Sequence, residues 1–189
     1  MNALKTLNLT KNLTISFDII FHDSLSIYGL PLRMTDLALK QTNTETGYRL
    51  FNLDCAEHIP GNFQSLYGSI PIIHSLNKSG QHLSSLLYHN TSDTWVEYEN
   101  NSLNNNEKNV KFISEGGIVN VYLYSDSNFE RIFYKQALIV GFSKLAPLFS
   151  LGYHQCRWSY MNQGDVNDLI TNFDKYDIPF DVIWLDIDV

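Results

Sequence analysis

A strand–helix–strand pattern over residues 148–189 constrains the fold of this chain more than any other feature. Leu148–Tyr153 is an apolar, strand-like run, and Asp181–Ile187 is a second, nearly continuous apolar run. Between them, Asn162 is a helix N-cap candidate. Apolar residues then recur at helical spacing, at Val166, Leu169, Ile170 and Phe173. A continuous apolar strand after a crossover helix predicts parallel pairing, with the strand buried on both faces.

One such unit cannot form a closed domain. A parallel barrel needs eight strands and about 250 residues, so we expect the sequence to stop inside a domain. In parallel α/β domains, functional residues collect at the carboxyl ends of the strands. Here those ends are Gln155–Trp158 and Asp186–Asp188.

The first two-thirds of the chain has the pattern of short strands. Apolar residues alternate from Leu13 to Phe21, which is the period of a half-buried strand. Further short runs, each bounded by turn residues, are Tyr48–Leu53, Ile70–Ile73, Leu83–Tyr88, Thr94–Tyr98, Val110–Ile113 and Ile118–Tyr124. Short strands at this spacing predict an antiparallel β-sandwich.

After the last of these runs, the apolar period changes from 2 to 3 and 4. This change predicts an amphipathic helix that begins near Ser127 and ends before Pro147. The predicted fold is therefore a mixture of α+β and α/β parts. It consists of a β-sandwich domain at residues 1–125, a linker helix at 126–147, and the start of a barrel at 148–189.

Charge and hydropathy exclude several classes of protein. The net charge is −7, and Lys and Arg are not clustered, so we expect no nucleic-acid partner. The longest apolar runs are far shorter than the ~20 residues of a bilayer-spanning helix, and no signal peptide is visible. His58 and His154 are isolated, so we expect no metal and no cofactor.

Two patterns bear on the compartment. Cys55 and Cys156 are too few for a disulfide framework, and we expect both to be buried, reduced thiols. The acceptor pattern Asn-x-Ser/Thr occurs at Asn8, Asn12, Asn77, Asn90 and Asn100. This density has two interpretations, chance in an Asn-rich chain or real glycosylation of a secretory-pathway parent.

The acids at the second strand end suit binding better than catalysis. Asp186 and Asp188 share one face of the strand, so they cannot lie on opposite sides of a sugar ring. A retaining glycosidase needs its two carboxyl groups ~5–5.5 Å apart across the scissile bond. Asp186 therefore either binds a sugar hydroxyl or caps a loop or helix. Trp158 either stacks on a sugar ring or belongs to a core.

Six motifs in order resemble glycoside hydrolase family 31. Leu148–Tyr160 and Phe180–Asp188 are similar to its barrel, and their Gly-Tyr-His-Gln and Ile-Trp-Leu-Asp-Ile forms resemble the glucosidase II type. The other motifs resemble the family's galactose mutarotase-like N-terminal sandwich, and are Ser26–Pro31, Tyr48–Asp54, Leu66–Pro71 and Ser92–Val96. The resemblance covers about Ile15–Val189.

The resemblance implies a retaining exo-α-glucosidase that removes terminal glucose from oligosaccharides or N-glycans. It assigns substrate-binding roles to four residues. Asp54 matches an acid on a sandwich loop, Trp158 an aromatic residue that lines the glucose subsite, Asp186 an acid that binds the glucose, and Ile187 an apolar wall. The family's nucleophile motif and its acid/base are absent from the chain, so we assign no catalytic residue. The implied location of the full-length parent is the endoplasmic reticulum lumen, with a glucosidase II β subunit as partner.

The chain also departs from the family pattern. Leu32 and Arg33 stand where Glu-His is expected, and Asp188 replaces an expected Glu. Two alternatives to an inactive piece of an α-glucosidase remain, namely a non-catalytic carbohydrate-binding sandwich and a structural module that docks on another protein.

Overall fold

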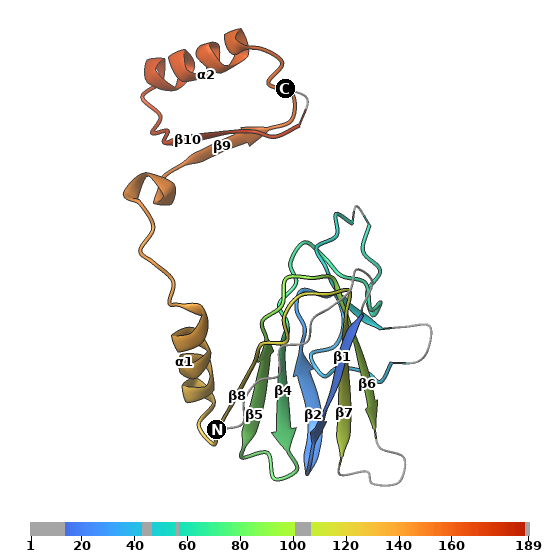
Figure 1. Ribbon diagram of the computed structural model, residues 1–189. Coiled ribbons are helices and arrows are strands. Elements are labelled where there is room, and N and C mark those ends of the chain that lie inside the picture. The colour runs from blue at the N-terminus through green and yellow to red at the C-terminus, as the bar shows by residue number, and fades with distance from the viewer. Residues whose placement is uncertain (1–13, 43–46, 56, 101–106, 188–189) are drawn as a thin grey trace. The chain divides into compact units, whose positions relative to one another are not determined.

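The computed structural model describes residues 14–42, 47–55, 57–100 and 107–187 (Figure 1). The chain divides into two compact units, Met1–Val140 and Gly141–Val189. The predictions that concern Asn8, Asn12, Leu13 and Asp188 lie outside the described residues.

The first unit is built on two antiparallel four-stranded sheets. One sheet has the order β1-β7-β6-β3 and the other β2-β4-β5-β8. The strands of the first are β1 (Ile15–Phe21), β7 (Lys108–Ser114), β6 (Thr94–Asn100) and β3 (Tyr48–Leu50). Those of the second are β2 (Ser24–Gly29), β4 (Ile72–Asn77), β5 (Leu83–Tyr88) and β8 (Val121–Asp126). The predicted β-sandwich is confirmed.

The core of the sandwich lies between the two sheets. Alternate residues of β1 point inward, as the period predicts, and Phe21 at its end is buried. The rings of Phe17 and Phe112 stack at 5.1 Å, and Tyr88 of the opposite sheet contacts both, at 5.0 and 5.2 Å. Aromatic pairs of this kind add about 0.5–1.5 kcal/mol each beyond the area that they bury. These rings therefore hold one sheet against the other.

The strand boundaries differ from the predicted ones where polar residues are buried. β2 is absent from the predicted strands because a bulge between Ser24 and Ser26 breaks the alternation, and the buried positions become Ser24 and Ile27. β4 continues past Ile73 because the buried Ser75 donates a hydrogen bond to Ser24 Oγ at 2.9 Å. The alternation of apolar residues does not predict a strand, or part of one, where the inward-facing residues are serines.

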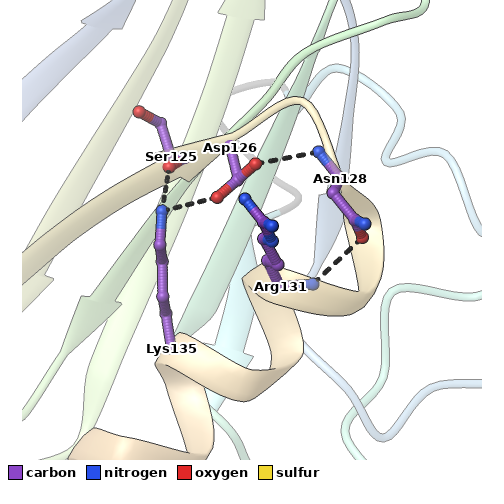
Figure 2. A network of polar contacts seen from close by, with 5 residues as sticks. All are labelled: Ser125, Asp126, Asn128, Arg131 and Lys135. Atoms are coloured by element: carbon purple, nitrogen blue, oxygen red, sulfur yellow. Dashed lines mark hydrogen bonds and ion pairs between the residues drawn. The ribbon is translucent and has the colours of Figure 1, made fainter.

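The helix α1 (Phe129–Val140) follows β8 and ends before Pro147, as predicted, and Gly141 directly after it adopts a φ of 96°. Figure 2 shows how it begins: Asn128 Oδ1 accepts from Arg131 N at 3.2 Å, and Asp126 Oδ1 from Asn128 N at 3.0 Å. Lys135 Nζ reaches back to Asp126 Oδ2 at 2.8 Å and to Ser125 O at 2.6 Å. The hydrogen bond from Lys135 is the largest cause that lowers the pKa of Asp126, to about 2.

The second unit contains the predicted parallel pair. The strands β9 (His154–Arg157) and β10 (Val182–Leu185) run parallel in the register Val182↔His154, and α2 (Gln163–Lys175) connects them. Asn162 caps α2 as predicted, since its Oδ1 accepts from Asp165 N at 3.1 Å. The predicted order and parallel direction are confirmed, but the first strand is His154–Arg157 and not Leu148–Tyr153, so Gln155–Arg157 belong to the strand and only Trp158 follows it.

Two predictions for this unit are wrong. Leu148–Leu151 forms a 3₁₀ helix (η1) instead of a strand, because Pro147 O accepts from both Ser150 N and Ser150 Oγ. The strand β10 is also not buried on both faces, since Trp184 is 55% and Leu185 52% exposed. Two strands and one helix present too little surface to cover both faces of the pair.

Among the described residues, none of the helices has the length and apolar character needed to cross a lipid bilayer.

Candidate functional site

Three of the four predicted site residues lie at the carboxyl edge of the β9–β10 pair. The register Leu185↔Arg157, continued by one residue, brings Asp186 level with Trp158. Ser159 N donates to Ile187 O at 3.1 Å, which ties the two strand ends together. Asp186 is exposed, and Trp158 and Ile187 are 62% and 50% exposed. A carboxylate, an indole face and an aliphatic side chain therefore share one open edge.

That combination suits a sugar ring. Ring hydroxyls donate well to a carboxylate, and hydrogen bonds to an ionised acceptor are about twice as strong as neutral ones. An indole face suits the apolar C–H surface of the ring. Trp158 is exposed, as are Trp184 and Leu185 of the same unit, so exposure does not distinguish stacking on a sugar from a place in a core.

A hydrogen-bond relay that the sequence pattern missed lies at the opposite end of the same strands. Trp184 Nε1 donates to His154 Nδ1 at 2.8 Å, so Nδ1 is an acceptor and the ring proton of neutral His154 is on Nε2. That Nε2 lies 3.0 Å from Ser150 O and donates to it. The parallel register offered a signal, since it pairs Val182 with His154 and places Trp184 two residues further along.

The glycine of the Gly-Tyr-His-Gln motif has a steric reason. A Cβ on Gly152 would lie 1.9 Å from Asp181 Oδ2 and 2.4 Å from its Cγ. The same Oδ2 accepts from Tyr153 N at 3.1 Å, and Val182 N donates to Tyr153 O at 3.2 Å. Gly152 thus lets the Asp181 carboxylate approach the backbone where the two strands begin.

The fourth predicted residue, Asp54, belongs to the first unit and lies on the loop after β3. Its Oδ1 accepts from Tyr67 Oη at 2.7 Å, and this hydrogen bond is the main cause that raises the pKa of Tyr67. The neighbouring Cys55 is buried, and its Sγ donates to Glu57 O and accepts from Gln64 Nε2, both at 3.0 Å. An exposed carboxylate is thus carried on an anchored segment.

Arg33, which departs from the family pattern, is hydrogen-bonded to this loop. Its guanidinium donates to three backbone carbonyls, those of Leu30 (2.9 Å), Phe63 and Arg49, and lies 5.1 Å from the Tyr48 ring centroid. Burial lowers the pKa of Arg33 to about 10, so the side chain stays charged at neutral pH. The expected Glu-His turn is replaced here by an arginine that joins the turn to β3 and to the loop that follows.

A cavity of about 310 Å³ opens beside the same loop. Arg49 lines it, and its guanidinium lies 4.0 Å from the Phe51 ring centroid and 4.8 Å from that of Trp95. Asn62 and Gln64 are also among the lining residues. Guanidinium, aromatic faces and amides form a polar–aromatic lining that motif reading did not assign a role. Its signal was the register Arg49↔Trp95 between β3 and β6.

The remaining reactive side chains are not gathered together. Across the described ranges, no three His, Cys, Asp or Glu side chains are placed to hold a metal ion. Both cysteines are free thiols, and Cys55 is buried as expected, but Cys156 is exposed, so the prediction that it is buried is wrong.

Comparison with known proteins gives two matches in chain order. Residues 5–97 match the family model "Glycosyl hydrolase 31 N-terminal galactose mutarotase-like domain", and residues 143–189 match "Glycosyl hydrolases family 31 TIM-barrel domain". The first match covers the greater part of the sandwich, and the second covers η1, β9, α2 and β10.

Curated relatives are α-glucosidases. A "Probable glucan 1,3-alpha-glucosidase" of Arabidopsis thaliana is 36% identical over 93% of this chain and 20% of its own length. A "Neutral alpha-glucosidase AB" of Dictyostelium discoideum is 35% identical over 93% of this chain and 19% of its own length. The chain thus spans about a fifth of the curated relatives that it matches.

Solved structures agree in fold. The catalytic subunit in an "ER glucosidase II heterodimeric complex" matches 94% of this chain and 21% of its own with a TM-score of 0.74 and 32% identity. A family 31 α-glucosidase of Bacteroides thetaiotaomicron, at 24% identity and a TM-score of 0.64, supports the fold alone. Sandwich and parallel unit therefore match one family in the same order, and this chain belongs to glycoside hydrolase family 31.

Proposed function

We propose that this chain is part of a retaining exo-α-glucosidase that removes terminal α-linked glucose from oligosaccharides or N-glycans. In this proposal the chain contributes part of the glucose pocket and neither catalytic carboxylate. The single observation that carries it is the parallel β9–β10 pair with Trp158, Asp186 and Ile187 at its carboxyl edge. The location of functional residues at that edge is general for parallel barrels.

The residues have distinct proposed roles. Asp186 accepts a hydrogen bond from a hydroxyl of the terminal glucose, Trp158 covers an apolar face of the ring, and Ile187 excludes water beside it. For Asp54, which Tyr67 holds on the sandwich loop, the proposed role is also to bind substrate, as the family resemblance implies. The division into a sandwich at 1–125, a linker helix at 126–147 and a barrel start at 148–189 is the domain plan that we propose.

Hydrolysis needs two further carboxyl groups. In a retaining mechanism one carboxylate attacks the anomeric carbon, and another acid protonates the leaving oxygen and then activates water. Asp186 cannot supply both roles. The 189-residue chain by itself is therefore expected to leave p-nitrophenyl α-glucoside intact.

Partner and location follow the same proposal. The related glucosidase II catalytic subunit was solved with the binding domain of its regulatory subunit, in a complex described as ER glucosidase II. We propose the endoplasmic reticulum lumen for the parent of this chain, with a β subunit of that kind as its partner.

The test uses a chimaera in which residues 1–189 replace the matching segment of the Dictyostelium relative. We expect it to hydrolyse p-nitrophenyl α-glucoside. Asp186→Asn should lower kcat/KM by about 10- to 100-fold, because a hydrogen bond to a charged group contributes about 1.5–3 kcal/mol. Asp174→Asn, an exposed acid on α2, is the matched control and should leave kcat/KM unchanged. Equal kinetics for the two variants would remove Asp186 from the pocket.

A carbohydrate-binding sandwich is the second candidate, and the Arg49–Phe51–Trp95 cavity favours it. Maltose titrations of the 189-residue chain separate the two candidates. Binding that is lost in Trp95→Ala but retained in Asp186→Asn supports the binding module. Binding that is too weak to measure in the chain, together with an active chimaera, supports the glucosidase.

A further inference from the structure

The structure distinguishes between two glycosylation acceptor patterns that are equivalent in sequence. Asn77-Lys-Ser79 lies at the turn between β4 and β5, and Asn90-Thr-Ser92 lies beyond the other end of β5. We propose that Asn77 is an N-glycosylation site of the folded protein and that Asn90 is not. The inference rests on the proposed endoplasmic reticulum location of the parent protein and does not depend on the proposed glucosidase activity.

The side chain of Asn77 can carry a glycan without losing its structural contacts. Its Oδ1 accepts from Gln81 N at 3.1 Å and from His82 N at 2.9 Å, which closes the hairpin. Its Nδ2 donates to Ser79 Oγ at 2.9 Å on the exposed side of the turn. Glycosylation leaves the amide oxygen and one N–H in place, so these contacts can persist in the modified protein.

The surroundings of Asn77 are also open. The next four residues, Lys78 to Gln81, are exposed, and Gly80 has no atom within 4 Å of where its Cβ would lie. The turn packs beside the β1–β2 connection through the hydrogen bond from Lys78 N to Asp23 O, 2.9 Å. A glycan on Asn77 would therefore extend over a stretch of four exposed residues.

Asn90 is half-buried like Asn77, but its side-chain amide is bound differently. Its Nδ2 donates to Tyr88 Oη at 2.6 Å and to Gly116 O at 2.9 Å, so both amide protons are already used. Its Oδ1 accepts from Ser92 N at 2.8 Å and lies 2.4 Å from where a Cβ on Gly117 would stand. Tyr88 is 1% exposed. A sugar on Nδ2 must break at least one of these bonds.

The two sites also differ in their distance from the candidate site. Asn90 lines a concavity with Asn52, on the same loop as Asp54. Asn77 lies at the other end of the β4–β5 pair, because the two strands are antiparallel with Ile72 opposite Leu87. A glycan at Asn77 therefore leaves the Asp54 loop uncovered.

The chemistry requires a lipid-linked oligosaccharide diphosphate as donor. Asn77 Nδ2 forms a bond to C1 of the first sugar, the C1–O bond to the diphosphate breaks, and Nδ2 loses one proton. The lipid diphosphate is the leaving group. No electron is transferred, and the amide oxygen is unchanged.

For the test, the full chain is expressed in cultured mammalian cells behind a cleavable secretion signal. A reference acceptor sequence of known occupancy lies between the cleavage site and the chain, so it remains on the secreted protein. The monomeric, folded fraction is treated with peptide-N-glycosidase in heavy-oxygen water, and peptide mass spectrometry then reads each site. We expect label at Asn77 and none at Asn90. Ser79→Ala should abolish the label at Asn77, and Ser79→Thr should retain it.

Two results would overturn the inference. One is an unlabelled Asn77 in molecules whose reference acceptor is labelled. The other is a labelled Asn90 in the folded fraction. Asn90→Gln provides a second readout, because it should leave the gel mobility of the glycosylated protein unchanged, whereas Asn77→Gln should remove one glycan step.

Discussion

Asn90 allows a quantitative test of how the sandwich is closed at this end. Asn90→Ala removes three hydrogen bonds, those to Tyr88 Oη, Gly116 O and Ser92 N. A neutral hydrogen bond contributes about 0.5–1.5 kcal/mol net, so three are worth about 3 kcal/mol. Tyr88 Oη keeps Ser114 Oγ at 3.0 Å as a partner, which limits the loss. We expect the free energy of unfolding to fall by about 2–3 kcal/mol.

The assay is urea unfolding followed by the amide NMR signals of β5 and β7, which report on the sandwich alone. For a chain of this size, about 2–4 °C of melting temperature accompanies each kcal/mol, so the variant should melt about 5–10 °C lower. The control is Asn120→Ala, directly before β8. The side-chain amide of Asn120 makes only a long and weak contact, to Tyr122 Oη at 3.4 Å. A loss at Asn90 no larger than that of the control would refute the network.

Three further predictions test the two units. Gly152→Ala should lower the opening free energy of the β10 amides, measured by hydrogen exchange, by about 2 kcal/mol, because Asp181 must give up a charge-assisted hydrogen bond. In an Asp181→Ala background the same change should lower it by less than about 0.5 kcal/mol. Equal losses in the two backgrounds would contradict the clash between the new Cβ and Asp181. Lys135→Met should raise the pKa of Asp126 from about 2 toward its ordinary value, read by NMR titration of the carboxyl group. Because the pKa of Asp126 is lowered in the folded state, its stabilising effect is present above pH 3.8 and is lost as the pH falls through 2. A free energy of unfolding of the wild type that does not change between these pH values would contradict this. Burial raises the pKa of Tyr48 to about 12, so its contribution to the free energy of unfolding is complete below pH 10 and is lost as the pH rises through 12. Tyr48→Phe should flatten the dependence of that free energy on pH between 10 and 12. An unchanged slope would exclude Tyr48 as its source.

The regular elements were predictable where one physical signal dominates. The period of β1 predicted its inward face, and the cap at Asn162 predicted the start of α2 to the residue. The crossover logic predicted the parallel direction of β9 and β10. The pattern failed at Leu148–Leu151, where a run of apolar residues without a period is compatible with several local structures.

Buried polar residues account for the other errors. Ser24 and Ser75 occupy inward positions that hydrophobicity assigns to the surface, and they are stable there because they bond to each other. A sequence pattern counts residues one at a time, but here each serine is acceptable inside only because the other is present. Such pairs, 51 positions apart, carry no local signal.

The same reasoning explains why the candidate site is only half accessible to prediction. Asp186 could be placed from the sequence because the strand that precedes it was predicted correctly, whereas the strand before Trp158 was predicted at Leu148–Tyr153 and lies at His154–Arg157. Asp54 could not be placed in this way, because its loop is held by contacts between distant residues, namely Arg33 to Phe63 O across 30 positions and Ser65 to Arg49 O across 16. Each of these bonds joins a side chain to a backbone carbonyl. Since every residue type has that carbonyl, the type of the accepting residue does not indicate the bond. We therefore expect changes at Arg33 or Ser65 to shift the loop that carries Asp54, although neither side chain contacts its carboxylate.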